Sequence, residues 1–210
     1  ISVNTFGLTP SVRVRQDKNT AEISIASSQL SRLFEEWFGK GAENKRIPRF
    51  VMLLPKEKQK AFIKGMWRGD GWIGRGRASY KTISRTLCEQ LKILLIRHQI
   101  VPVISVNRAY GIHRESYTIQ VGSRRDIKML SLLLDTQIAM RPEGKSPSSV
   151  ILEDFVLTPI REIVTFDYDG PVYNFEFEDV HSYFVENASI HNFGDFGILI
   201  ALKGAIAKLN

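Results

Sequence analysis

His191 and Asn192 close an apolar stretch over residues 172–192 and carry the most specific chemistry in the sequence. An asparagine side-chain amide can attack its own backbone carbonyl, which forms a succinimide and breaks the following peptide bond. The reaction requires a proton donor at the carbonyl and a backbone that holds the amide in line. The imidazoles of His181 and His191 are candidate donors, and the alternating apolar residues predict a strand, a turn and a strand. We therefore predict that Asn192 cyclises with the help of both histidines; a plain surface turn is the alternative for a His-Asn pair taken alone.

A second candidate site lies where a predicted helix over roughly residues 56–69 ends in an aspartate. Gly65 and Gly69 are four residues apart, so they share one face of this helix and allow a second helix to approach closely. Asp70 follows at the C-terminus, where the helix dipole disfavours an anion. Gly71 is expected to adopt the left-handed conformation that ends many helices. A carboxylate in this position is a candidate ligand for a divalent cation, and two such helices would hold Mg²⁺ over a pair of phosphates; an Asp-Gly turn that caps a core helix is the alternative.

The charge of the chain is divided unevenly between two parts. Residues 1–152 carry 26 Lys and Arg against 12 Asp and Glu, a net of +14, whereas residues 153–210 carry 3 against 10, a net of −7. The basic part suits a polyanion such as double-stranded DNA, with a solvated basic surface as the alternative. A Pro/Ser/Gly-rich stretch over residues 141–149 separates the two parts and reads as a linker. The single cysteine, Cys88, is expected to be a buried thiol in an intracellular, cytoplasmic protein, and no apolar run is long enough to suggest a membrane span.

Two stretches of the basic part repeat one pattern of strand, hairpin, strand and helix. The first copy covers residues 10–34, and the second covers residues 102–130. The second copy is preceded by a predicted helix, two strands over roughly residues 72–83, and a helix over roughly residues 85–98, which makes a unit of helix, two strands, helix, two strands and helix. The first copy has no counterpart of this preceding half. We therefore expect residue 1 to fall inside a folding unit; a single unit with a degenerate echo is the alternative.

The helix that ends in Asp70 resembles the LAGLIDADG motif of homing endonucleases. Arg68 stands where the family has its first acidic residue, which is usually not the metal ligand. The resemblance implies Mg²⁺-dependent cleavage of double-stranded DNA, with Asp70 as the metal ligand and a lysine near the cleaved phosphate. Lys81 is the candidate for this lysine, with a plain phosphate contact as its alternative role. The matching positions are Ile63, Gly65, Met66, Trp67, Gly69, Asp70 and Gly71. The strands that follow carry side chains able to read base edges in a major groove, and the predicted DNA-binding residues are Arg75, Arg77, Tyr80, Asn107, Arg108, Arg114 and Gln120.

Residues 172–192 resemble the C-terminal splicing blocks of inteins. In that family Cys, Ser or Thr follows the cyclising asparagine and accepts the acyl chain, but here Phe193 occupies the position. Asn174 stands where many inteins have Asp. The resemblance implies that Asn192 can cyclise whereas ligation of flanking segments cannot occur. The residues that carry it are Val172, Tyr173, His181, Tyr183, His191 and Asn192.

Together these features predict an α+β chain: one complete and one partial αββαββα repeat of the LAGLIDADG type, followed by the β-rich C-terminal part of an intein (Hint) splicing domain. The expected partners are double-stranded DNA and an N-terminal half, in the same precursor or in a separate chain, with no membrane. A DNA-binding protein that has lost both reactions and an RNA-binding maturase are the alternative functions. The expected boundaries are residues 1–45 for the trailing half of the first repeat, 46–138 for the second repeat, 139–152 for the linker, 153–192 for the splicing part and 193–210 for a flanking segment.

Overall fold

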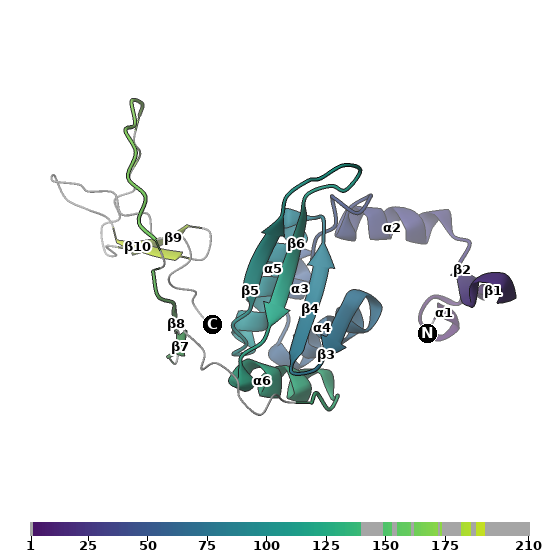
Figure 1. Cartoon of the computed structure of the whole chain (residues 1–210). Coiled ribbons are helices and arrows are strands. Elements are labelled where there is room, and N and C mark those ends of the chain that lie inside the picture. Colours follow the sequence, from purple (N-terminus) through teal and green to yellow (C-terminus); the bar gives the residue numbers. More distant parts are fainter. Residues whose placement is uncertain are drawn as a thin grey trace.

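The chain is α+β, as predicted. The computed structural model describes residues 2–139, 149–152, 155–160, 162–171, 173, 182–185 and 188–191 (Figure 1). Among these residues no helix is both long and apolar enough to cross a membrane.

The complete repeat has the predicted order of helices and strands. It runs through α4 (Lys56–Asp70), β3 (Gly71–Gly74), β4 (Arg77–Thr82), α5 (Arg85–Arg97), β5 (Val103–Asn107), β6 (Ser116–Val121) and α6 (Arg124–Leu134). The four strands form one antiparallel sheet in the order β3-β4-β6-β5. This order places β4 and β6, the second strands of the two hairpins, side by side at the centre of the sheet. The two hairpins therefore form one continuous sheet.

One face of this sheet packs against helices and forms the core. Ile63 on α4, Leu91 and Leu94 on α5, and Ile119 on β6 are each 0% exposed. Figure 1 shows α4 and α5 behind the sheet and α6 at one end of it. Truncating such a buried Leu or Ile to Ala typically costs about 2–5 kcal/mol, so the packing of these helices dominates the stability of the repeat.

Serine hydroxyls start two of the helices in the complete repeat. Ser84 Oγ accepts from the Leu87 N–H at 3.1 Å before α5, and Ser123 Oγ accepts from the Asp126 N–H at 3.0 Å before α6. Each such N-cap typically stabilises a helix by about 1 kcal/mol. The caps fix where the helices begin, and thereby fix which of their faces meets the sheet.

The other face of the sheet is not covered by a helix of the repeat. Alternation along β4 places Arg77, Ser79 and Lys81 on this open face, while Ala78 and Tyr80 point into the core. The strand register aligns Trp72, Ser79, Gln120 and Val103 in one row across all four strands. The open face is therefore a surface of mostly polar and basic side chains that also exposes the apolar Trp72 and Val103 at its two edges.

The partial first repeat also has the predicted elements: β1 (Ser11–Arg15), β2 (Thr20–Ser24) and α2 (Ser28–Phe38). The strands pair antiparallel with each other. The helix α1 (Ser2–Phe6), the 3₁₀ turn η1 (Gln16–Lys18) and the helix α3 (Arg49–Met52) are additional short elements that the sequence pattern did not predict. Every residue of β1 and β2 is exposed, and Figure 1 shows the hairpin beyond the far end of α2 from the four-stranded sheet.

A short hairpin begins inside the predicted linker and packs against the complete repeat. It consists of β7 (Val150–Ile151) and β8 (Val156–Leu157). Val156 is 2% exposed because it packs against Ile96 of α5, and Arg125 donates to the Ser149 carbonyl at 3.3 Å. The predicted boundary between residues 152 and 153 lies between β7 and β8. Contacts with Ile96 and Arg125 attach this hairpin to α5 and α6.

The last described strands are β9 (Ser182–Val185) and β10 (Ala188–His191), which pair antiparallel. They lie in the later part of the stretch over residues 172–192 for which a strand, a turn and a strand were predicted. The first strand predicted in that stretch, over residues 172–177, lies outside the described residues except for Tyr173.

Candidate cation site and DNA interface

Asp70 lies at the C-terminus of α4, and the sheet begins at the next residue. Gly71 is in extended conformation with φ −82° and ψ 148°, so the predicted left-handed turn is wrong. The glycine is required for space instead: a Cβ at this position would lie 2.4 Å from the Trp67 carbonyl oxygen and 2.3 Å from its indole ring. The chain therefore passes directly from the helix into β3, and Asp70 is held at the junction of the helix and the sheet.

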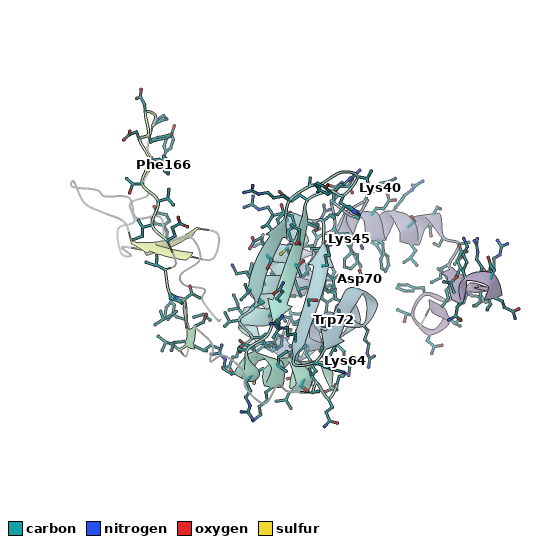
Figure 2. All side chains as sticks on the ribbon, in the orientation of Figure 1. Lys40, Lys45, Lys64, Asp70, Trp72 and Phe166 are labelled. Carbon is teal, nitrogen blue, oxygen red and sulfur yellow. The ribbon has the colours of Figure 1, made fainter. Side chains whose placement is uncertain are left out.

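Two side chains approach Asp70, and both approach the same carboxylate oxygen. The Lys45 ammonium nitrogen lies 3.9 Å from Oδ2, and the Tyr80 hydroxyl donates to Oδ2 at 3.5 Å. Figure 2 shows Lys45, Asp70 and Trp72 following one another along the sheet. The Asp70 side chain is 61% exposed, so this cluster is open to a ligand that arrives from solvent.

The backbone around Lys45 is fixed by the N-terminal half of α5. Ser84 Oγ donates to the Lys45 carbonyl at 2.6 Å. The Gln90 side-chain amide accepts from the Ile47 N–H at 2.6 Å and donates to the Ile47 carbonyl at 2.9 Å. Lys45 is the residue that sequence reasoning missed as a site residue, although it belongs to a basic string just before the helix. Its contact with Asp70 depends on these long-range bonds, which no local pattern reveals.

Tyr80 belongs to the Asp70 cluster and not to the DNA interface. Its side chain is 4% exposed and its ring lies 5.9 Å from the Trp67 ring, between centroids. Burial, together with the neighbouring Asp70 carboxylate, raises the pKa of Tyr80 to about 12. The prediction that Tyr80 contacts bases from the open face is therefore wrong, because its position in the alternation of β4 directs the side chain toward the helices.

The glycine face of α4 is open in the part of the chain that the structure describes. A Cβ at Gly65 or Gly69 would meet no atom within 4 Å. On the opposite side of the helix, Ile63 and Trp67 are buried in the core. A second helix that packs on the glycine face is still a prediction.

The other residues predicted to bind DNA divide between the open face and its two hairpin turns. Arg77, Gln120 and Asn107 lie on strands of the open face, and Lys81 lies among them, paired in register with Thr118. Arg75 lies in the turn between β3 and β4, whereas Arg108 and Arg114 lie in the loop between β5 and β6. Arg114 pairs with Glu43 at 3.6 Å, and the Asn107 amide donates to Thr118 Oγ1 at 3.0 Å. These residues therefore lie on the open face and at both of its ends, because the register places the two hairpin turns at opposite ends of the sheet.

This cluster supplies one carboxylate ligand, Asp70, to a candidate Mg²⁺ site. Among the described residues no group of three or more His, Cys, Asp or Glu side chains is close enough to hold a metal. Mg²⁺ keeps several waters and commonly binds through one or two carboxylates together with substrate phosphates. One exposed carboxylate at the edge of a basic surface is compatible with that mode of binding, provided that phosphates and a further carboxylate complete the coordination.

The residues predicted for asparagine cyclisation are described only in part. His191 ends β10, and its backbone pairs with Ser182, the residue that follows His181. His181 and Asn192 lie outside the described residues. The register therefore brings His191 to the open end of the hairpin, opposite the sequence neighbour of His181.

Cys88 is the buried thiol that the sequence predicted. It is 1% exposed on α5, and burial raises the pKa of its thiol to about 11. Because the thiolate is the reactive form, these features favour a packing role for Cys88 in the core.

Comparison with known proteins defines the class of the complete repeat. Residues 57–131, from α4 into α6, match the model of the LAGLIDADG-like domain family, so this segment is similar to that family. The chain is similar to a DNA polymerase of Thermococcus hydrothermalis (25% identical over 202 residues; 89% of this chain and 12% of the polymerase). It is also similar to the ATP-dependent DNA helicase Hel308 of Thermococcus kodakarensis (27% identical over 206 residues; 88% of this chain and 18% of the helicase). The chain thus spans less than a fifth of either relative. Among solved structures, a mesophilic variant of the homing endonuclease I-DmoI is similar with a TM-score of 0.48 and 17% identity, over 64% of this chain and 68% of that chain.

Proposed function

We propose that this chain is the C-terminal portion of an intein that carries a site-specific double-strand DNA endonuclease. The endonuclease part would comprise the LAGLIDADG-like domain and the partial repeat before it. The self-processing part would cyclise Asn192, with splicing impaired because Phe193 offers no nucleophile. The observation that carries the endonuclease proposal is the exposed Asp70 carboxylate, with Lys45 beside it, at the edge of a basic sheet surface.

The pattern of relatives supports an inserted element. Nearly the whole chain is similar to a segment of a polymerase and to a segment of a helicase, although it spans only 12% and 18% of those proteins. A polymerase and a helicase carry out different reactions, so the segment they share with this chain is not specific to either reaction. An element that carries its own activity and sits within unrelated host proteins accounts for this distribution.

Each side chain of the site has a role in the proposed cleavage of DNA. Arg77, Gln120 and Asn107 would contact base edges from the open face, as Arg recognises guanine and Gln or Asn recognises adenine. Bound at Asp70, Mg²⁺ would supply Lewis-acid stabilisation of the charge that develops on the cleaved phosphate. Lys45 would place its ammonium group against the same phosphate, and Lys81, on the open face, would hold a neighbouring phosphate.

The glycine face of α4 and the exposed first repeat would both be covered by the proposed N-terminal half. Four-spaced glycines permit a close helix pair, and a second helix of the same kind would bring its own terminal carboxylate close to Asp70. Two carboxylates would then serve the two strands of the duplex. This half is expected either in the same precursor or as a separate chain.

The proposal is tested by cleavage of a randomised duplex library with Mg²⁺, using the chain together with its N-terminal half. We expect a single cut sequence to be enriched, and we expect Asp70→Asn to abolish cutting while duplex binding persists. Binding should fall steeply with salt because phosphate contacts release counterions. Salt-sensitive binding without cutting would instead indicate a DNA-binding protein, and selective binding of structured RNA would indicate a maturase.

The self-processing part is tested separately by intact-mass measurement. During prolonged incubation with the N-terminal half, we expect slow release of residues 193–210, because cyclisation of Asn192 itself breaks the bond to Phe193 and leaves a succinimide that water can then open. Asn192→Ala should stop this loss and His191→Ala should slow it. A spliced product would contradict the role assigned to Phe193, and an unchanged mass would show that this part no longer processes itself.

A further inference from the structure

We infer that Tyr80 is a positioning residue, whose hydroxyl fixes the rotation of the Asp70 carboxylate so that Oδ1 is the oxygen presented to a divalent cation. This inference rests on the proposed role of Asp70 as a cation ligand and extends it to a residue that does not touch the cation itself.

The first support is that both neighbours of the carboxylate select one oxygen. Tyr80 donates to Oδ2 at 3.5 Å, and the Lys45 ammonium group lies 3.9 Å from the same Oδ2. The terminal torsion of an aspartate is broad and nearly two-fold, so the side chain alone does not distinguish its two oxygens. Two donors on Oδ2 make the oxygens different, and the oxygen that neither donor approaches is Oδ1.

The second support is that Tyr80 is held much more rigidly than Lys45. The Tyr80 ring is 4% exposed and packs against Trp67, whereas the Lys45 side chain is 52% exposed. The strand register places Tyr80 directly opposite Gly71, the residue after Asp70. The hydroxyl is thus fixed by the core and by backbone pairing on β4, while the lysine has a long flexible side chain that can follow a phosphate.

The third support is the close packing around Gly71, the residue that follows Asp70. Gly71 fits only without a side chain, because Trp67 occupies the space where a Cβ would lie. Trp67 therefore packs against both Gly71 and the ring of Tyr80, so the residue that follows Asp70 is held against the same ring that Tyr80 contacts. Ligands of a metal site generally depend on such supporting groups for orientation, and losing one typically costs about 10–100-fold in affinity or activity.

A purely structural role for the Tyr80 hydroxyl would predict a different result from a positioning role. A structural hydroxyl would change the stability of the fold when removed and leave cation binding unchanged. A positioning hydroxyl would change cation binding even where the fold is retained. The readout must therefore be cation binding at this site, measured without any cleavage reaction.

The experiment is a titration of the full chain with Mn²⁺ alone, followed by the paramagnetic broadening of the Gly69 and Gly71 backbone amide signals. We expect Asp70→Asn to abolish site-specific broadening. We expect Tyr80→Phe to raise the Mn²⁺ concentration needed for half-maximal broadening by about 10-fold. Tyr117→Phe is the matched control: Tyr117 lies on β6 of the same sheet and its hydroxyl donates to Glu115, so its removal should leave the titration unchanged.

The outcomes separate this inference from the proposed function. Broadening that persists in Asp70→Asn would overturn the cation role of Asp70 itself. If Asp70→Asn abolishes broadening and Tyr80→Phe behaves as the wild type, only the role of Tyr80 is overturned. A second measurement needs no variant: with tyrosine labelled at Cζ, Mg²⁺ should shift the Tyr80 carbon signal and leave that of Tyr117 in place, and an unmoved Tyr80 signal would also overturn the inference.

Discussion

The two copies of the strand–strand–helix unit share a sequence pattern but differ completely in burial. Ile23 on β2 is 67% exposed, whereas Ile119, at the matching position of β6, is 0% exposed. The next apolar pair shows the same contrast, with Ile25 40% exposed and Val121 1% exposed. Both copies form their hairpin and their helix, so local propensity suffices for the elements. Burial depends on the half of the repeat that packs against them.

The helices of the two copies show where the first copy is attached. Phe34 on α2 is 43% exposed, while the matching Leu130 on α6 is 0% exposed. The C-terminal end of α2 packs against the complete repeat and the segment before it. Phe38 is stacked on Phe62 with ring centroids 6.5 Å apart, and the Trp37 ring lies 5.1 Å from the Phe50 ring. The first copy therefore has the same apolar face as the second, but without the helices and strands that cover it. This exposed face is the surface that we propose for the N-terminal half.

The largest expected effect concerns the matched isoleucines of the two hairpins. Ile119→Ala should lower the free energy of unfolding by about 2–5 kcal/mol, because it removes buried methyl groups and leaves a cavity. Ile23→Ala should change it by less than about 0.5 kcal/mol, as expected for a surface position. Urea denaturation of both variants gives the comparison. Equal losses would show that the first hairpin is buried in solution, either by self-association or by another part of the chain.

Adding the proposed N-terminal half sharpens the same comparison. In its presence Ile23→Ala should become costly while the cost of Ile119→Ala stays the same, because only the environment of the first copy changes.

The sequence predicted most of the fold because the periodic segments coincide with real elements. Periods of two and of about 3.6 residues located every strand and long helix of the complete repeat. The helix α3 was missed because it spans only Arg49–Met52, which is too short to show a period. The conformation of Gly71 was wrong because the cause, contact with Trp67, is a matter of packing and not of turn chemistry.

The candidate site was predictable in its aspartate and less so in its neighbours. Asp70 is marked by a local motif, and the structure places it at the exposed edge that the motif implies. Lys45 contacts Asp70 only through tertiary packing, which no sequence period encodes. The alternation along β4 could have predicted the placement of Tyr80. Ala78 and Tyr80 lie on one face of the strand, while the polar Ser79 and Lys81 lie on the other.

The second expected effect concerns a buried carboxylate that has an apolar counterpart in the first copy. Asp126 is 2% exposed and accepts hydrogen bonds from the Arg125 guanidinium at 2.9 Å and from the Val101 N–H at 3.3 Å. Asp126→Ala should cost about 1–3 kcal/mol because it leaves these donors without an acceptor. The matching Leu30→Ala in α2 should cost clearly less, because Leu30 is only half-buried. Chemical denaturation of the pair tests this, and an equal cost would mean that the Asp126 network adds nothing to stability.

The third expected effect concerns the serine N-caps, which the two copies share. Ser123→Ala should lower global stability by about 1 kcal/mol, since α6 is part of the core. Ser27 makes the same bond, accepting from the Leu30 N–H at 3.2 Å, so Ser27→Ala should weaken α2 by a similar amount. Because α2 is largely outside the core, that loss should appear as faster amide hydrogen exchange in α2 without a change in the global unfolding midpoint. A shift of the midpoint would show that α2 and the core unfold together.

The smallest expected effect concerns the position that ends the helix in each copy. Gly39 ends α2 with φ 84°, and the matching Asp135 ends α6 with φ 48°, so both residues have the positive φ that glycine adopts most readily. Unlike the glycine, Asp135 also pairs with Lys64 at 2.6 Å and Lys60 at 3.2 Å. These two ammonium groups hold the pKa of Asp135 below its ordinary value of 3.8. A lowered pKa in the folded state means that the stabilisation is present above pH 3.8 and is lost as the pH falls through the lower, folded value.

Asp135→Asn isolates this charge effect, because asparagine also tolerates the left-handed conformation. The variant should be slightly less stable than the wild type at pH 7, and the difference should shrink as the pH falls below 3.8 and through the lower, folded pKa of Asp135. Denaturant midpoints measured across this pH range test the prediction. The pair is exposed, so high salt should reduce the difference at pH 7 as well. A difference that is independent of both pH and salt would show that Asp135 stabilises α6 through its backbone conformation alone, as Gly39 does for α2.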